Sequence, residues 1–201
     1  MISIIDIGIG NINSVTKVLD HLGTEYSLVS NPSDLAGASK LIFPGVGSFS
    51  AASVKLEKSG LKDTLKTLIN NGMPYLGICL GMQLLAESGD EGGFHKGLGV
   101  IKAEVKKIEV PPTLNLPHIG WNSIDVNSAK LFGGIPNQTD FYFVHSYSMH
   151  VADEDALTCA TEYGSKIVAY VEKGHVFGTQ FHPEKSQRYG IKLVENFIKL
   201  C

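Results

Sequence analysis

Cys79 lies between two glycines, Gly77 and Gly81, each two positions away from it. Glycines at this spacing make room for a sharp turn from a strand into a helix, as in the nucleophile elbow of serine hydrolases. At the N-terminus of such a helix, unpaired amides and the helix dipole favour the thiolate, the form of cysteine that attacks carbonyl carbons. The pattern predicts a cysteine nucleophile. The alternative is a buried structural cysteine in a glycine-rich turn.

A histidine and a carboxylate that could serve this cysteine follow much later, in Phe181-His182-Pro183-Glu184. The apolar run that ends at His182 predicts a strand whose tip presents the imidazole, and Pro183, which has no N–H, would end the strand ladder. Residues two apart in an extended chain project to the same side, so Glu184 would reach His182 and fix its tautomer. An isolated His-x-Glu is typical of a solvated strand end, whereas together with a cysteine elbow it favours a Cys-His-Glu triad.

Size and composition restrict the class of protein. The chain has 201 residues, of which 43% are hydrophobic, so we expect one domain spanning residues 1–201. A net charge of −3 without runs of Lys or Arg argues against a nucleic-acid partner. Three scattered cysteines without a CxxC pair predict a reducing compartment, the cytoplasm, and no metal site. No basic leader and no apolar run of about 20 residues is present, so we expect no membrane association.

Strand and helix signals alternate through the first half of the chain. We expect strands at residues 2–7, 26–29, 40–43 and 75–78, and helices at residues 12–22 and 61–69. This alternation predicts βαβ units and a parallel sheet covered by helices on both faces.

The second half of the chain has a different character. Residues 88–99 are rich in glycine and are expected to form a loop. Further β-rich runs occupy residues 100–108, 123–126, 141–146, 167–171 and 176–181, and a final helix is expected around residues 191–198. The predicted fold class is therefore α/β, with a mostly parallel central sheet flanked by helices and an antiparallel β extension.

The turn Gly8-Ile9-Gly10-Asn11 follows the first expected strand and suggests a dinucleotide or phosphate site. However, Asn13 stands where the third glycine of GxGxxG would be, and no acidic residue ends the second strand as a ribose ligand. We therefore expect no cofactor. The remaining interpretations are a tight turn in which Asn11 or Asn13 caps the helix, and a surface that contacts another protein.

Together these segments resemble the class I (triad-type) glutamine amidotransferases, and more narrowly the glutaminase subunits of imidazole glycerol phosphate synthases. The similar stretches are residues 8–15, 44–49, 76–85, 117–122, 142–147 and 178–186. The cysteine elbow and His-Pro-Glu are shared by the whole class, whereas Pro-Gly-Val-Gly, His-x-Gly-Trp-Asn and Phe-Val-His-Ser-Tyr are the specific part. The opening turn departs mildly from the family pattern, because Ile7 replaces the usual tyrosine. The resemblance implies a flavodoxin-like α/β fold.

The resemblance also implies an activity. Cys79 would hydrolyse the side-chain amide of L-glutamine to glutamate and ammonia. The ammonia would pass to a (β/α)8 cyclase subunit in a heterodimer, which makes imidazole glycerol phosphate and an aminoimidazole carboxamide ribonucleotide in histidine biosynthesis. In the family, the strand at residues 44–47 is thought to rearrange when the synthase is engaged, so we expect low activity without the partner.

By the same resemblance, site residues fall into four groups. The catalytic group is Cys79, His182 and Glu184; the oxyanion hole is Leu80 with Val46 or Gly47; the glutamine-binding group is Gln83, Glu91, Ser146 and Tyr147; the partner interface is Asn11, Ser14, Trp121, Asn122, His145 and Lys185. Other interpretations stay open for some of them: Ser146 and Tyr147 fit an ordinary sheet edge, and Trp121 fits a half-buried core position.

Three other functions remain as alternatives. The chain could be a paralogous subunit that supplies ammonia for amidation of a nucleotide-linked sugar, or a free-standing cysteine hydrolase of a related elbow fold. It could also be a catalytically silent regulatory subunit, against which the intact Cys79, His182 and Glu184 argue.

Overall fold

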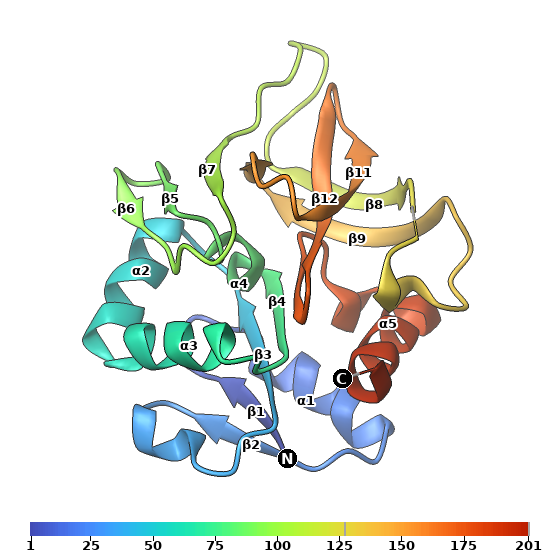
Figure 1. Ribbon diagram of the computed structural model, residues 1–201. Helices are drawn as coiled ribbons and strands as arrows, with labels where there is room; N and C mark the ends of the chain where they lie inside the picture. The colour runs from blue at the N-terminus through green and yellow to red at the C-terminus, as the bar shows by residue number, and fades with distance from the viewer. Residues whose placement is uncertain (127, 201) are drawn as a thin grey trace.

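A seven-stranded sheet forms the centre of the computed structural model, which describes residues 1–126 and 128–200. The strand order is β11-β12-β13-β4-β3-β1-β2 (Figure 1). The strands are β1 (Ile2–Ile5), β2 (Tyr26–Val29), β3 (Lys40–Gly45), β4 (Tyr75–Cys79), β11 (Leu157–Glu162), β12 (Lys166–Lys173) and β13 (Val176–Thr179). Strands β2, β1, β3, β4 and β13 run parallel, and β12 and β11 extend the sheet antiparallel at one edge. The predicted mostly parallel sheet is thereby confirmed.

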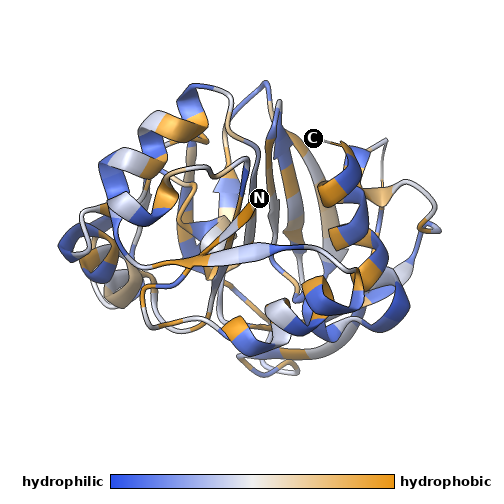
Figure 2. Cartoon of the chain, turned by 90° about the horizontal axis from the view of Figure 1, so that it is seen from below, coloured by the Kyte–Doolittle hydropathy of each residue, from blue (hydrophilic) through white to orange (hydrophobic). Residues whose placement is uncertain are grey.

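Two helical layers cover the faces of this sheet (Figure 1, Figure 2). One layer contains α1 (Ile12–His21) and α5 (Gln187–Leu200), and the other contains α2 (Phe49–Lys58) and α3 (Leu61–Asn70). Alternate side chains of each parallel strand enter opposite layers. In β3, for example, Ile42 packs in the core of the α1 and α5 layer, whereas Leu41 and Phe43 pack in the core of the α2 and α3 layer. Burial on both faces explains why residues 41–43 of β3 and residues 75–78 of β4 form continuous apolar runs.

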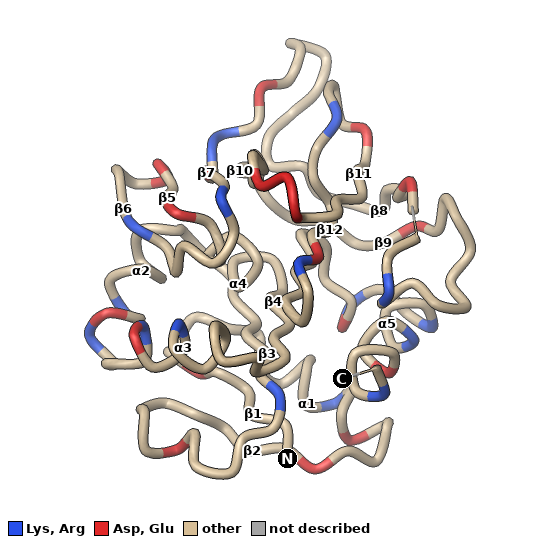
Figure 3. The backbone as a smooth tube through the Cα atoms, in the orientation of Figure 1, with Lys and Arg blue, Asp and Glu red and all other residues tan. Residues whose placement is uncertain are grey.

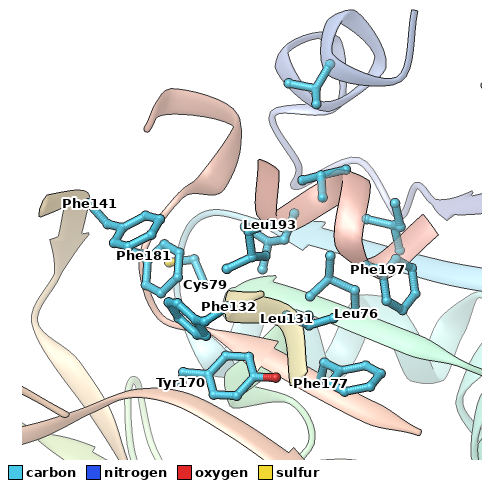
Figure 4. Packing of buried hydrophobic residues seen from close by; sticks show 14 of the residues in the cluster. Leu76, Cys79, Leu131, Phe132, Phe141, Tyr170, Phe177, Phe181, Leu193 and Phe197 are labelled. Atoms are coloured by element: carbon cyan, nitrogen blue, oxygen red, sulfur yellow. The ribbon is translucent and has the colours of Figure 1, made fainter. Parts of the chain in front are cut away.

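Aromatic side chains fill the core on the α1 and α5 side of the sheet (Figure 4). The ring centroids of Phe141 and Phe181 lie 4.2 Å apart, and the Phe132 ring meets the ring of Tyr170 edge-on at 5.1 Å. Cys79 belongs to the same buried cluster. One side of the cysteine is therefore walled by apolar side chains that exclude water.

Two smaller sheets lie toward the top of Figure 1, beyond the carboxyl ends of the parallel strands. One has the strand order β10-β7-β5-β6, and the other pairs β8 with β9 antiparallel. Their strands are β5 (Ser88–Gly89), β6 (His95–Lys96), β7 (Ala103–Lys107), β8 (His118–Ile124), β9 (Thr139–His145) and β10 (Tyr147–Val151). The remaining short elements are α4 (Leu80–Gln83) and the 3₁₀ helices η1 (Pro32–Leu35), η2 (Lys130–Phe132) and η3 (Pro183–Lys185).

Helix α2 is absent from the sequence prediction. Half of its buried positions are small, at Ala52 and Ser53, so its apolar repeat is weak. Its start is marked instead by Ser48, whose Oγ accepts a hydrogen bond from the Ala51 N–H at 3.3 Å.

Several boundaries also differ from the prediction. Residues 88–99, expected to be a loop, include the short strands β5 and β6, which pair antiparallel. The first strand ends at Ile5 rather than at residue 7, because the Asp6 carboxylate accepts a hydrogen bond from the Gly8 N–H at 2.9 Å and turns the chain. Strands β10 and β11 are further additions, and β8 begins at His118, earlier than residue 123.

Charged residues are dispersed along the chain (Figure 3). Lys and Arg are interspersed with Asp and Glu on the small sheets, the helices and the connecting loops. Of the helices within residues 1–126 and 128–200, none combines the length and the apolar composition needed to cross a bilayer.

Candidate active site

The predicted turn from strand to helix is present at Cys79, which ends β4 and immediately precedes α4. Its φ of 53° and ψ of −104° are unusual for a residue with a side chain. A Cβ atom on Gly77 would overlap the Gly81 carbonyl, and one on Gly81 would overlap the Phe43 carbonyl of β3. The two glycines thus let the backbone pack closely around a cysteine held in a strained conformation, of the kind that clusters at functional sites.

Tyr75, the first residue of β4, stabilises the turn at Cys79 through its side chain. Its side chain is fully buried, and its hydroxyl donates a hydrogen bond to the Gly81 carbonyl at 2.8 Å. Burial raises the pKa of the Tyr75 phenol, so the hydroxyl keeps its proton and remains a donor. This bond satisfies a carbonyl of α4, a helix too short to pair its own backbone groups.

The position of β4 in the sheet gathers the other predicted residues around Cys79. Strands β3 and β13 flank β4 and run parallel to it, so the carboxyl ends of all three meet at the cysteine. The segment at residues 44–47 forms the end of β3 and the two residues after it, and residues 180–182 follow β13. The predicted oxyanion segment and the predicted base therefore approach Cys79 from opposite sides.

His182 and Glu184 make the expected contact, but by a different backbone path. Strand β13 ends at Thr179, and Pro183 begins the 3₁₀ helix η3 instead of ending an extended strand. Within this turn the Glu184 carboxylate accepts a hydrogen bond from Nδ1 of His182 at 2.8 Å. The expectation of two side chains on one side of an extended segment was wrong, because Pro183 at the first position of a helical turn is a favourable start for it.

Burial and charge oppose each other at His182. Burial lowers its pKa, but the nearby Cys79 and the Glu184 carboxylate outweigh that effect and raise the pKa to about 10. Among the described residues, Nε2 of His182 is buried without a hydrogen-bond partner. Because Nδ1 is taken by Glu184, Nε2 is the atom left to exchange a proton with a bound molecule.

A cavity of about 400 Å³ opens beside Cys79. Its lining residues are Val46, Gly47, Ser48, Cys79, Gln83, Glu91, Pro117, Val144, His145, Ser146 and Tyr147. All four residues expected to bind glutamine are among them, together with both candidates for the second oxyanion donor. Ser48, Pro117 and Val144 were not predicted to line a site, although each lies within one of the family-like stretches of the sequence.

Within residues 44–47, where the second oxyanion donor is expected, the Val46 N–H is already hydrogen-bonded to another part of the protein. The Val46 N–H donates to the Ile9 carbonyl at 2.8 Å, so it is already paired. Gly47 follows with φ of +107°, a conformation that favours glycine. Leu80 begins α4 directly after Cys79, where a helix has unpaired N–H groups. The expected donor at Leu80 thus lies at the elbow, whereas the Val46 N–H could serve as the expected second donor only after its bond to Ile9 is broken.

Gln83 and Glu91 are both tied to the protein. Nε2 of Gln83 donates to the Tyr147 carbonyl and to Oε1 of Gln180, each at 3.0 Å. Oε2 of Glu91 accepts a hydrogen bond from the Phe49 N–H at 2.8 Å, at the start of α2. Burial and the nearby Asp90 charge raise the pKa of the Glu91 carboxyl, whereas the hydrogen bond from the Phe49 N–H lowers it. Burial has the largest effect, so the net result is a raised pKa.

Most residues expected at the partner interface lie at or near the surface. Trp121, on β8, is 48% exposed, and the Tyr142 ring meets it edge-on at 6.0 Å. Nζ of Lys185 lies 5.5 Å from the centre of the Tyr142 ring. At the start of α1, Nδ2 of Asn11 donates to Oγ of Ser14 at 2.8 Å.

His145 is the exception among these interface residues. It is buried, lines the cavity, and pairs through Nε2 with Nδ1 of His118 at 3.1 Å. The alternation of β9 explains this, because Phe141, Phe143 and His145 share its inner face. Burial lowers the pKa of both imidazoles to about 4, with the Tyr147 carbonyl opposing this at His145. His118, which the sequence analysis did not single out, also touches Asn122, whose Nδ2 lies 3.4 Å from Nε2 of His118.

Comparison with known proteins gives a consistent family. A family model described as glutamine amidotransferase class-I matches residues 3–200. A protein of Campylobacter jejuni (strain RM1221) named imidazole glycerol phosphate synthase subunit HisH 1 is 48% identical over 202 residues, covering 100% of both chains. A protein of Methanocaldococcus jannaschii named imidazole glycerol phosphate synthase subunit HisH is 44% identical over 201 residues, also covering 100% of both.

Solved structures agree on the fold. A glutamine amidotransferase from Thermotoga maritima superposes with a TM-score of 0.67 at 18% identity, covering 99% of this chain and 82% of that one. PurLQS from Thermotoga maritima gives a TM-score of 0.76 at 17% identity, covering 99% of this chain and 97% of that one. At these identities the likeness shows the fold alone.

Proposed function

This chain belongs to the glutamine amidotransferase class-I family, and from that premise we propose that it is the glutaminase subunit of an imidazole glycerol phosphate synthase in histidine biosynthesis. The observation that carries the proposal is the cavity beside Cys79, which is lined by Gln83, Glu91, Ser146 and Tyr147. Its volume of about 400 Å³ is sufficient for an amino acid of the size of glutamine.

The proposed reaction begins with attack of the Cys79 thiolate on the side-chain amide carbon of glutamine. The oxyanion that forms is stabilised by the Leu80 N–H and a second N–H from residues 44–47. His182 gives its Nε2 proton to the departing nitrogen, and the carbon–nitrogen bond breaks. Ammonia is released, and a γ-glutamyl thioester on Cys79 remains.

The second half regenerates the enzyme. Neutral His182 takes a proton from water, the resulting hydroxide attacks the thioester, and the carbon–sulfur bond breaks to release glutamate and the Cys79 thiolate. Glu184 holds Nδ1 of His182 at 2.8 Å throughout, so Nε2 stays directed at the reacting groups.

Hydrogen-bond capacity restricts how glutamine is held. Both N–H groups of the Gln83 amide are used, by the Tyr147 carbonyl and by Gln180. Only Oε1 of Gln83 remains for the substrate, and an oxygen accepts from the α-ammonium group. We therefore assign Gln83 and the Glu91 carboxylate to the α-ammonium end, and Ser146 and Tyr147 to the rest of the amino-acid group.

We further propose that activity depends on a (β/α)8 cyclase subunit that docks on Asn11, Ser14, Trp121, Asn122 and Lys185 and receives the ammonia. The bond from the Val46 N–H to the Ile9 carbonyl supports this, because it holds a candidate oxyanion donor away from the cavity while linking it to the turn next to Asn11. Loss of one oxyanion donor costs about 10²–10³-fold in rate, which is enough for a switch.

The test is glutamate release by the chain alone, with a cyclase subunit, and with cyclase plus its nucleotide ligand. We expect low activity alone and a large increase in the full mixture. Cys79→Ala is expected to abolish it, whereas Cys159→Ala, which removes the other described buried thiol, is expected to retain it. Full activity in the isolated chain, unchanged by either addition, would instead indicate a free-standing hydrolase, and stimulation only by a sugar-amidating synthase would indicate the paralogous subunit.

Two further assignments accompany this proposal. We place the protein in the cytoplasm, which is consistent with the observation that neither Cys79 nor Cys159 forms a disulfide bond. We also treat residues 1–201 as one domain, because both hydrophobic cores are built on the same central sheet.

A further inference from the structure

We propose that the side-chain amide of Gln180 donates a hydrogen bond to the Cys79 sulfur and stabilises it as a thiolate. This rests on the proposed role of Cys79 as the nucleophile. Gln180 would be a neutral hydrogen-bond donor to the nucleophile, in addition to the three triad residues. It is held in place by Gln83 and Tyr147, which line the substrate cavity.

The geometry of Gln180 is closely determined. Its Nε2 lies 3.6 Å from Sγ of Cys79, within hydrogen-bonding distance for sulfur. The residue is fully buried, and its backbone N–H donates to the Ala169 carbonyl at 2.8 Å, which continues the pairing with β12 beyond the end of β13. Water therefore does not compete for the amide, and the backbone cannot carry the side chain away from the sulfur.

A carboxamide can be reversed end for end, so the donor role needs an argument from its partners. The Tyr147 carbonyl only accepts hydrogen bonds, and therefore the atom of Gln83 that faces it must be Nε2. The same Nε2 also contacts Gln180, so the atom of Gln180 that faces it must be the oxygen. The NH₂ group of Gln180 is consequently the end that faces Cys79.

The Tyr147 carbonyl, from which the orientations of Gln83 and Gln180 were deduced, is itself held in place. The Tyr147 carbonyl also accepts from Nδ1 of His145 at 2.9 Å. The proton of neutral His145 is thus on Nδ1, its Nε2 is an acceptor, and His118 donates to it through Nδ1. Tyr147 is held from both sides, so the orientation inferred for Gln83 and Gln180 does not depend on a mobile group.

A neutral donor acts differently from the imidazolium of His182. An N–H bonded to sulfur favours the charged form of the thiol, and hydrogen bonds to charged groups are stronger than those between neutral groups. The effect of His182 disappears when the imidazole loses its proton, whereas the Gln180 amide does not titrate. Gln180 therefore still donates to the sulfur when His182 is neutral and the thioester is being hydrolysed, and it stabilises the negative charge that develops on the sulfur as the carbon–sulfur bond breaks, which favours sulfur as the leaving group.

Two substitutions separate donation from packing. Gln180→Met keeps the length and apolar stem but has no donor. Gln180→Glu keeps the shape and still accepts from Gln83, but it places a carboxylate against the sulfur. The control is Asn196→Leu, which removes another buried amide that makes two hydrogen bonds, to the Leu131 and Gly133 carbonyls, away from the cavity.

The measurement is the rate of alkylation of Cys79 by iodoacetamide from about pH 5 to about pH 10, with the labelled site identified by mass spectrometry. We expect the midpoint of the rate profile to move up by about one pH unit in Gln180→Met and by more in Gln180→Glu, with no shift in Asn196→Leu. Circular dichroism checks folding. A folded Gln180→Glu protein with the midpoint of the wild type would overturn the proposal. Glutamine hydrolysis is not needed for this assay, so a failure of the proposed function would leave its result readable.

Discussion

Replacing Glu184 by Gln removes a charge from a buried pair with little change of shape. The His182 and Glu184 side chains are only 1% and 2% exposed, and their hydrogen bond is 2.8 Å long. A hydrogen bond to a charged group contributes about 1.5–3 kcal/mol, more than its neutral counterpart. At 1.36 kcal/mol per factor of ten, we expect kcat for glutamine hydrolysis to fall about ten- to a hundredfold.

The same substitution has a signature in stability. The pKa of His182 is raised to about 10, so its contribution to the unfolding free energy is complete below about pH 6.5 and is lost as pH rises toward 10. Since the Glu184 charge is part of that rise, Glu184→Gln is expected to make the loss of stability between about pH 6 and pH 9 smaller. Urea unfolding at both pH values measures this, and glutamate release in the presence of the cyclase measures kcat. A variant with kcat within about twofold of wild type would refute the assignment of Glu184 as the group that orients His182.

Two further predictions concern the base and the partner surface. His182→Asn is expected to be more damaging than Glu184→Gln, and to slow labelling of Cys79 by a glutamine-analogue electrophile; equal labelling rates by mass spectrometry would mean that His182 does not activate the thiol. Trp121→Ala, at a ring that is 48% exposed, is expected to weaken binding of the cyclase about thirtyfold or more while leaving alkylation of Cys79 unchanged; undiminished binding in a titration would move the interface elsewhere.

The cysteine elbow could be predicted because its chemistry and its backbone requirements coincide in one short segment. Gly77 is needed because its Cβ would overlap the Gly81 carbonyl within the same turn, and this turn puts Cys79 at a helix start. The contact between His182 and Glu184 was equally local. The backbone conformation between these two residues could not be predicted, because Pro183 is compatible both with the end of a strand and with the start of a helical turn.

Gln180 and His118 were missed for a different reason. Gln180 lies within an apolar run, and its partners Gln83 and Cys79 are distant in sequence, so its role exists only once β13 is paired with β4. His145 could have been placed correctly, since it continues the alternation of Phe141 and Phe143 along β9. Helix α2 was missed because Ala52 and Ser53 bury little apolar surface, although Ser48 is an ordinary capping signal.

The place of β4 between β3 and β13 has a consequence for the order in which the protein is made. Strands β1 to β4 can pair as soon as they have been synthesised, whereas β13 follows only after both small sheets. Until then β4 is an edge strand that is paired only with β3, and Cys79 at its end has neither His182 nor Gln180 beside it. A nascent chain on the ribosome therefore carries the proposed nucleophile without its proposed base. The strand that pairs with β4 also brings the residues proposed to complete the site, so we expect a partly synthesised chain to be unable to hydrolyse glutamine by the proposed mechanism.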